Sequence, residues 1–292
     1  GVEIEETHSD YTGQGVSCFG DNDGFIDVTV TGGAGGYIYE WSAVDPNGQT
    51  ITVPADTDGD ITGLVAGTYT LIATDSNGCS NTEIVEITQN EELTASETAS
   101  DFTGQGISCF GEDDGSINLE TNGGTGVYEY AWSAVDTDGQ TITVPAADAN
   151  GNITGLVAGT YSVVVSDENG CEFPIEIEIT QNEELTAEHI TSEYGIYQIS
   201  CRNEDDGSIE LTPTGGTGIY FYQWSAVDVE GQSIDLTQDT PTQSDLIAGT
   251  YSVVVSDENG CEFPIEIVMT QPEQGVEIEE THSDYTGQGV SC

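Results

Sequence analysis

Residues 66–79 read Ala-Gly-Thr-Tyr-Thr-Leu-Ile-Ala-Thr-Asp-Ser-Asn-Gly-Cys, and nearly the same stretch returns at residues 158–171 and 248–261. In each copy Gly-Thr-Tyr opens a run of residues that favour β-strands. Asn-Gly then follows, which is a strong signal for a two-residue hairpin, because both central positions of a type I′ turn need a positive φ. Three copies of one hairpin predict three copies of one domain.

The cysteines set the length of that domain. Two series recur at nearly constant spacing: every 91 or 92 residues for Cys18, Cys109, Cys201 and Cys292, and every 90 or 92 residues for Cys79, Cys171 and Cys261. About ninety residues is an ordinary size for a small β-sandwich. The sequence therefore predicts three modules, at residues 1–90, 91–182 and 183–273, followed by the start of a fourth at 274–292.

The two ends of the sequence are copies of each other. Residues 1–18 and 275–292 both read GVEIEETHSDYTGQGVSC. We therefore expect the sequence to be a window from a longer array, in which the larger repeating unit is three modules.

The charge balance is extreme. The chain has 54 acidic residues, one basic residue (Arg202) and a formal net charge of −53. Such a charge keeps modules soluble and mutually repelling, and it argues against nucleic acid and anionic membrane surfaces as partners. The sequence has no long apolar run of the kind that would predict insertion into a membrane. The aromatic residues and repeated Val/Ile runs supply a core, so we do not expect a disordered chain.

Alternating apolar and polar residues predict an all-β fold with no helix. In the first module the expected strand segments are residues 2–6, 16–19, 25–30, 37–44, 50–53, 61–64, 68–74 and 83–88. About seven short strands at this spacing predict an immunoglobulin-like antiparallel β-sandwich in each module. The expected core residues are Trp41, Trp132 and Trp224, together with Tyr69, Tyr161 and Tyr251.

Paired cysteines in a repetitive, loop-rich chain indicate disulfides formed in an oxidising compartment. Zinc is the weaker alternative, because the sequence has no Cys-x-x-Cys and only three histidines. A disulfide that closes about sixty residues would stabilise each module by roughly 4 kcal/mol in the chain-entropy treatment.

The pairing depends on where Cys18 lies. A turn at residues 21–24 separates Cys18 from the next strand, so its own short segment can lie beside the start of the strand that follows Cys79. This placement predicts one disulfide within each module: Cys18–Cys79, Cys109–Cys171 and Cys201–Cys261, with Cys292 left unpaired because its module is truncated. The alternative is a bond between modules, such as Cys18–Cys171. Very short linkers at 89–91, 181–183 and 271–273 predict a semi-rigid rod in which each module touches the next.

Calcium is the candidate ligand, and no cofactor is required. Calcium takes several oxygen ligands from closely spaced carboxylates and carbonyls. The candidate ligands are Asp56, Asp58 and Asp60 in the first module and Asp148, Asn150 and Asn152 in the second. The equivalent stretch of the third module, residues 240–244, has no acidic residue, and the next acid is Asp245. Calcium binding should therefore weaken from the first module to the third. The alternative is that these residues form acidic surface turns.

Enzyme activity is not expected. The absence of lysine excludes a Schiff base, a phosphate-loop lysine and a lysine–asparagine cross-link. No nucleophile elbow or zinc-protease motif is present. Pairs of carboxylates occur by chance at any spacing among so many acids, so they do not indicate a glycosidase.

Several motifs together resemble the SprB repeat, a family of large surface proteins of Bacteroidota that includes a gliding adhesin. The matching residues in the first module are Ser17-Cys18-Phe-Gly, Asp23-Gly24, Gly32-Gly33, Tyr37, Trp41, Leu64-x-Ala66-Gly-Thr-Tyr69 and Asp75-x-Asn77-Gly-Cys79. The resemblance implies type IX secretion, display outside the cell on its surface, and a structural or adhesive role in a filament used for gliding motility or attachment.

We therefore expect a non-catalytic segment of an extracellular adhesin stalk or fibre. Its expected partners are neighbouring modules of the chain and, beyond them, surface polysaccharide or other cells. The alternative is an array of glycan-binding modules, whose combined sites gain strength by multivalency. That alternative requires an exposed aromatic platform repeated in every module, whereas a stalk does not.

Overall fold

The computed structural model describes residues 1–53, 58–236 and 239–273. These residues form 21 β-strands and no helix. The chain divides into two compact units. One contains Gly1–Ile107 and Gly111–Thr180, and the other contains Ser108–Phe110 and the chain from Gln181 onward.

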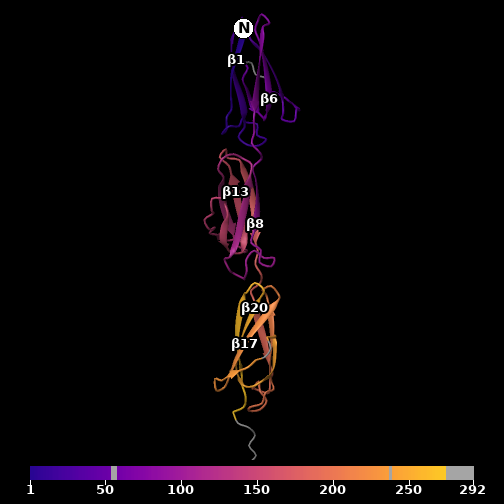
Figure 1. Ribbon diagram of the computed structural model, residues 1–292, viewed down its shortest axis with the longest axis vertical. Helices are drawn as coiled ribbons and strands as arrows, with labels where there is room; N and C mark the ends of the chain where they lie inside the picture. Colours follow the sequence, from indigo (N-terminus) through magenta and orange to yellow (C-terminus); the bar gives the residue numbers. More distant parts are fainter. Residues whose placement is uncertain (54–57, 237–238, 274–292) are drawn as a thin grey trace, which may run out of the picture. The chain divides into compact units, whose positions relative to one another are not determined.

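The strands fall into three sets of seven, one in each predicted module (Figure 1). The first set is β1 Val2–His8, β2 Gly24–Gly32, β3 Ile38–Val44, β4 Thr50–Ile51, β5 Ile61–Leu64, β6 Gly67–Thr74 and β7 Ser80–Ile87. The second set is β8 Thr94–Ala99, β9 Gly115–Asn122, β10 Glu129–Val135, β11 Thr141–Ile142, β12 Ile153–Leu156, β13 Gly159–Ser166 and β14 Glu172–Ile179. The third set is β15 Thr186–Thr191, β16 Gly207–Thr214, β17 Tyr220–Asp228, β18 Ser233–Ile234, β19 Thr242–Leu246, β20 Gly249–Asp257 and β21 Glu262–Met269.

Each set forms two antiparallel sheets. In the first module a three-stranded sheet has the order β1-β2-β5, and a four-stranded sheet has the order β4-β3-β6-β7. The second and third modules repeat both orders with their own strands. The predicted all-β, immunoglobulin-like sandwich is confirmed.

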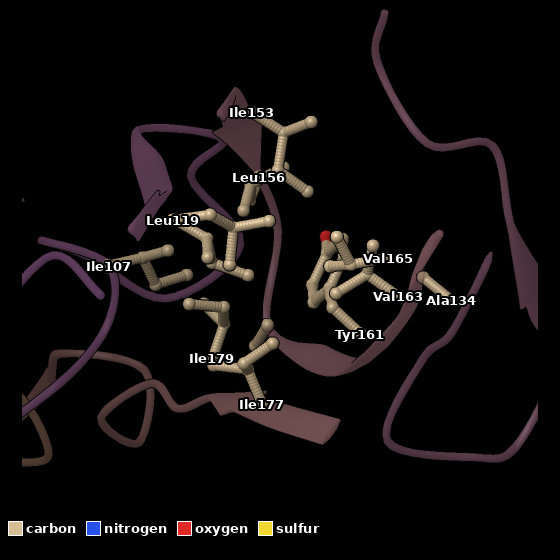
Figure 2. Close-up of a cluster of buried hydrophobic side chains, with 12 residues drawn as sticks. Ile107, Leu119, Ala134, Ile153, Leu156, Tyr161, Val163, Val165, Ile177 and Ile179 are labelled. Atoms are coloured by element: carbon tan, nitrogen blue, oxygen red, sulfur yellow. The ribbon is translucent and has the colours of Figure 1, made fainter. Parts of the chain in front are cut away.

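The alternation of buried and exposed residues along the strands explains which residues form the core. Along β6, Tyr69, Leu71 and Ala73 are buried, whereas the residues between them are more exposed. Side chains on a strand alternate between its two faces, so this strand turns one face inward. Figure 2 shows the same pattern in the second module, where Tyr161 and Val163 of β13 point into the core cluster.

A buried tyrosine fixes the start of β6, β13 and β20. The hydroxyl groups of Tyr69, Tyr161 and Tyr251 donate hydrogen bonds of 2.9, 3.0 and 2.9 Å to the backbone carbonyl four residues upstream. This contact corresponds to the tyrosine corner of immunoglobulin-like sandwiches. The prediction that these three tyrosines belong to the core is confirmed.

The three tryptophans pack at the border of the core. Each tryptophan is half-buried against the cluster of buried hydrophobic residues in its own module. Each indole N–H donates to a backbone carbonyl at 2.9–3.0 Å, and the pairs are Trp41 to Gly59, Trp132 to Gly151 and Trp224 to Thr240. The tryptophans therefore join the core and the long β4–β5 connection of each module, or its equivalent.

Raising the pH above about 10 should lower the free energy of unfolding, in part because the folded chain resists ionisation of Tyr251. Burial raises the pKa of Tyr251 to about 12, whereas a tyrosine in an unfolded chain titrates near 10. The folded state therefore binds this proton more tightly, so its stabilising effect is complete below about pH 10 and is lost between about pH 10 and 12. Denaturant unfolding measured from pH 8 to 12 should show a smaller loss of stability in Tyr251→Phe than in the unchanged chain.

Candidate functional site: disulfide-bonded module junctions

Cys18 lies at the end of β7, and not at its start. The backbone N–H groups of Gly15 and Val16 both donate to the carbonyl of Thr88, at 3.0 and 3.1 Å. Residues 16–19 form bends and turns in place of the expected strand, although Val16 is fully buried. Thr88 immediately follows β7, so this segment is held at the far end of that strand.

Cys79 lies at the opposite end of the same strand, immediately before β7 begins at Ser80. β7 has eight residues, and a strand rises by about 3.3 Å per residue, so the two ends are roughly 25 Å apart. A disulfide requires Cα atoms about 4.4–6.8 Å apart. Cys18 and Cys79 therefore cannot pair within one module.

The predicted pairing within modules is wrong for all three bonds, Cys18–Cys79, Cys109–Cys171 and Cys201–Cys261. The structure instead pairs Cys18 with Cys171 and Cys109 with Cys261, with Cα–Cα distances of 5.6 and 5.5 Å. These bonds follow the alternative, in which the first cysteine of one module pairs with the second cysteine of the next. Cys79 and Cys201 are exposed free thiols, and Cys292 lies outside the described residues.

The turn that presents Cys171 is organised by Asp167. One carboxylate oxygen accepts hydrogen bonds from the N–H groups of Asn169 and Cys171, both at 2.9 Å. The other oxygen accepts from the N–H of Thr125 at 2.9 Å, which ties the turn to a neighbouring loop. Asp75 and Asp257 make the same bonds in the other modules. The N–H groups of residues such as Ala34 and Cys79 hold the pKa of Asp75 below its ordinary value.

This turn differs from the predicted type I′ turn. Gly78 has a positive φ of 83°, but Asn77 is not among the residues with positive φ. The N–H of Gly78 donates to the carbonyl of Asp75, and the N–H of Asp75 donates to the carbonyl of Cys79, both at 2.9 Å. Only the glycine needs the left-handed conformation, because the Asp75 carboxylate stabilises the rest of the turn.

The asparagine of the turn makes a contact that our reading of the sequence missed. Asn169 donates from Nδ2 to the carbonyl of Ser17 at 3.1 Å, and its Oδ1 accepts from the hydroxyl of Thr12 at 2.8 Å. Asn259 donates in the same way to the carbonyl of Ser108 at 3.0 Å. Each asparagine therefore binds the residue that precedes the partner cysteine. The available signal was the threefold recurrence of Asp-x-Asn-Gly-Cys, which a hairpin turn alone does not require.

Asp167→Asn should destabilise the junction. The amide nitrogen would replace the oxygen that accepts from Thr125, so a partly buried N–H would lose its acceptor at a cost of about 1 kcal/mol. Asp136→Asn is the matched control, because Asp136 also accepts two turn N–H groups on one oxygen but lies in a different turn. Urea unfolding should show the loss in the first variant and a change below about 0.5 kcal/mol in the control. Equal losses would contradict this role for Asp167.

Aromatic side chains line the first junction. Phe19 and Phe173 border one hollow together with Cys18, Cys171 and the linker residue Leu93. The hollow marks the place where the loops of the two modules meet beside the disulfide.

The proposed calcium ligands have structural roles where the structure describes them. The side chain of Asp60 accepts the N–H of Val28, and that of Asn152 accepts the N–H of Leu119, both at 2.8 Å. Asp148 accepts the N–H groups of Asn150 and Asn152 at 2.8 and 3.0 Å.

Asp60 and Asn152 are therefore equivalent acceptors for the middle of β2 and β9, just beyond the residues that pair with β5 and β12. Hydrogen bonds from Asn152 and Asn150 also lower the pKa of Asp148. Burial raises the pKa of Tyr39, and Tyr37, Asp58 and Asp60 raise it further. Asp56 lies outside the described residues. Within the described ranges, no three His, Cys, Asp or Glu side chains are grouped as a metal site would need, so calcium binding stays a prediction.

The outer face of the four-stranded sheet does not repeat an aromatic platform. At equivalent exposed positions the three modules have Ile38, Glu129 and Phe221. The tyrosines that precede or open these strands are used internally, since Tyr128 and Tyr220 donate to the carbonyls of glycines at 2.7 and 2.8 Å. At this position, therefore, the described strands of the three modules do not share an exposed aromatic residue. The described residues also contain no helix long and apolar enough to span a membrane.

Comparison with known proteins identifies the repeat. The SprB repeat family matches residues 14–46, 105–137 and 196–229. No curated protein sequence matches the chain. Similar solved structures include a tetra-tandem repeat in the extending region of a large adhesion protein, with 16% identity, 93% of this chain and 75% of that chain covered, and a TM-score of 0.33. Another is a Ca²⁺-stabilised adhesin that helps an Antarctic bacterium reach out and bind ice, with 18% identity, 91% and 73% coverage, and a TM-score of 0.35. The three matched segments each contain the first cysteine of a module, and each module therefore carries a SprB repeat.

Proposed function

We propose that this chain is a tension-bearing, non-catalytic segment of a long extracellular adhesin or surface fibre. The observation that supports this function best is the offset of the two disulfides. Cys109 lies between Cys18 and Cys171 in the sequence, whereas its partner Cys261 lies beyond them. The two bonds are therefore interleaved.

Interleaving gives the chain three covalent paths through the disulfides between residues 18 and 261. One path crosses from Cys18 to Cys171 and follows the backbone to Cys261, over 90 residues. A second follows the backbone from Cys18 to Cys109, over 91 residues, and then crosses to Cys261. A third crosses from Cys18 to Cys171, follows the backbone back to Cys109 over 62 residues, and then crosses to Cys261. When the modules unfold under a pulling force at the termini, the shortest of these three arms becomes taut first and limits the extension.

The same connectivity protects against cleavage. A single break of the backbone anywhere between Cys18 and Cys261 leaves two covalent paths intact, because the broken arm is bypassed by the other two arms. Disulfides within modules would not do this, since a break in any linker would then separate the ends. The arrangement therefore suits a protein that must remain continuous outside the cell.

Single-molecule stretching tests this function. We expect the fully unfolded, oxidised chain to extend to roughly two-fifths of the length of the reduced chain, because each residue spans at most about 3.6 Å and the shortest of the three parallel arms has 62 residues. A variant with all four bonded cysteines replaced by serine is the control and should extend fully without reductant. An oxidised chain that reaches the length of that control would contradict the proposal.

The three SprB-repeat matches and the strongly acidic composition support the proposal of a surface location, with export by type IX secretion and a Bacteroidota source. A net charge of −53 makes neighbouring fibres repel one another. Gliding motility and attachment to polysaccharide or to other cells are the roles that the family resemblance favours for the complete protein.

Calcium would stiffen the first module if the loop at residues 56–60 binds it. We expect the melting temperature of the first module to rise most with calcium, that of the second to rise less, and that of the third to stay unchanged. A ligand present at one hundred times its Kd stabilises the folded state by about 2.7 kcal/mol. Calorimetry with chelator and then with millimolar calcium measures this, and Asp58→Asn should abolish the rise. No shift in any module would show that these acids are surface turns alone.

A further inference from the structure

We propose that β7 of the first module pairs with β7 of a second copy of this chain, so that two fibres join side by side through one continuous sheet. β7 is an edge strand, because among the described strands it pairs with β6 alone. An edge strand presents a row of backbone N–H and C=O groups, and proteins usually protect it with proline or with charged side chains. The three modules differ in this protection.

The edge strands of the second and third modules contain a proline. Pro174 of β14 and Pro264 of β21 occupy the same place in the register with the neighbouring strand, and Thr82 occupies it in β7. Proline lacks an N–H, so it fits an edge strand only where that N–H would face outward. The outward donor that proline removes from β14 and β21 is therefore present in β7.

The hydrogen bond made by Thr82 agrees with this direction. Its backbone N–H donates to Oδ1 of the exposed side chain of Asn81 at 2.9 Å. The N–H and C=O groups of alternate residues point to the same side of a strand, so Ile84 and Glu86 also present theirs at the open edge. The Asn81 side chain thus satisfies one outward donor in a single copy, at the place where the carbonyl of an added strand would accept it.

The charged residue that protects the other two edge strands is also missing from β7. Glu176 of β14 and Glu266 of β21 lie two residues after the prolines, and both are exposed. The equivalent residue of β7 is Ile84, whose side chain is 63% exposed. Both protective features are therefore absent from the same strand of the same module.

Ile84 ends an apolar stripe on the outer face of the four-stranded sheet. Ile72 of β6 and Ile38 of β3 are exposed on the same face, and the register places Ile72 one diagonal step from each of the other two. Diagonal neighbours on a sheet are within reach of long side chains. In the second module the two ends of this diagonal are Glu129 and Glu176. The stripe that reaches the open edge is thus apolar in the first module and acidic at both ends in the second.

The sequence of β7 is complementary to itself about Ile84, which identifies a second copy as the partner. In an antiparallel pair centred on this residue, Ile84 lies opposite Ile84 of the second copy. Thr82 lies opposite Glu86, and Glu83 lies opposite Val85, so no two glutamates face each other. The two apolar stripes join into one. The outward residues exchange about six backbone hydrogen bonds, because each opposed pair of this kind makes two.

The same pairing is disfavoured for β14. It would place Glu176 opposite Glu176 of the second copy, and like charges directly opposite each other are destabilising. The net charge of −53 does not prevent the contact at β7, because charges more than about 8 Å apart are largely screened at physiological ionic strength. Repulsion along the rest of the fibre instead restricts association to the strand that lacks both protective features.

The experiment uses the full chain with Cys79→Ser, Cys201→Ser and Cys292→Ser, which prevents thiol cross-links between copies. Sedimentation equilibrium measures association from about 1 μM to about 1 mM protein. The runs are made at about 0.15 M and about 0.5 M NaCl, because screening weakens the repulsion between copies. We expect a reversible equilibrium between monomer and dimer that shifts toward the dimer at the higher salt concentration.

Two variants give β7 the residues of the other edge strands, so the first module should keep its fold and its melting temperature. Thr82→Pro removes the outward donor, and Ile84→Glu places two acids opposite each other. Each should weaken dimerisation at least about tenfold, because the symmetry of the contact applies the change twice. Val268→Glu is the matched control, since Val268 is an exposed apolar residue on β21, which keeps its proline. The control should leave association unchanged.

Hydrogen exchange locates the contact within the dimer. The amide protons of Thr82, Ile84 and Glu86 should exchange more slowly as the protein concentration rises, whereas those of β14 should not change. The proposal would be overturned by a chain that stays monomeric at every concentration, by a dimer that neither variant weakens, or by a dimer that leaves these three amides unprotected. Neither disulfide takes part in this contact, so such a failure is distinguishable from failure of the tension-bearing function.

Discussion

Replacing Cys18 and Cys171 together by serine should lower the free energy of unfolding of the first two modules by about 5 kcal/mol. This value follows from the chain-entropy treatment for a loop of about 150 residues, and the two cysteines are 153 residues apart. The loss should also change the form of the transition. Without the bond, each module keeps its own core and should unfold more independently of its neighbour.

Cys79→Ser is the matched control for this effect. Cys79 is exposed and free, so its replacement should change stability by less than about 0.5 kcal/mol. Pairing within modules would give the opposite result for this variant, because Cys79 would then be the partner of Cys18. Guanidinium unfolding of both variants, without reductant, decides between the two arrangements.

Tyr161→Ala should destabilise the second module by about 3–5 kcal/mol, since truncating a fully buried aromatic residue leaves a cavity. Tyr161 is 1% exposed and packs among the residues drawn in Figure 2. Tyr161→Phe keeps the ring and removes only the hydrogen bond to Val157. It should cost about 1 kcal/mol, with a larger loss if the carbonyl stays buried without a donor.

Tyr194→Phe is a suitable surface control, because the Tyr194 side chain is 43% exposed. Its hydroxyl makes only a long contact of 3.3 Å with the carbonyl of Asp206. Calorimetry of the three variants should rank the losses as Tyr161→Ala, Tyr161→Phe and Tyr194→Phe, from largest to smallest. A loss in Tyr161→Phe as large as that in Tyr161→Ala would contradict a role based mainly on packing.

The strands and the core could be predicted because they depend on local patterns. The Gly-Thr-Tyr opening and the alternation that follows it place Tyr69, Leu71 and Ala73 on one face, whatever the rest of the chain does. The turn after β6 was predicted to exist, but its type was wrong. Its geometry depends on a carboxylate, Asp75, that accepts N–H groups from the turn and from a loop about forty residues away.

The disulfide pairing could not be predicted with the same security, because it depends on a long-range choice. The segment before Cys18 can satisfy its backbone at either end of β7, and the sequence pattern is compatible with both. Hydrogen bonds from the N–H groups of Gly15 and Val16 to the carbonyl of Thr88 hold this segment at the far end of β7. Because of this placement, every cysteine pair differs from the prediction. The acidic loops show the same limit, since Asp60 and Asn152 have the side-chain oxygens of cation ligands but accept backbone N–H groups in the middle of β2 and β9.

Peptide mapping of the non-reduced chain tests the central claim most directly. The chain should be denatured at acidic pH with free thiols blocked, digested, and analysed by mass spectrometry before and after reduction. We predict linked peptides that contain Cys18 with Cys171 and Cys109 with Cys261, and a blocked thiol at Cys79. Peptides that link Cys18 with Cys79 would contradict the interleaved arrangement and the function proposed from it.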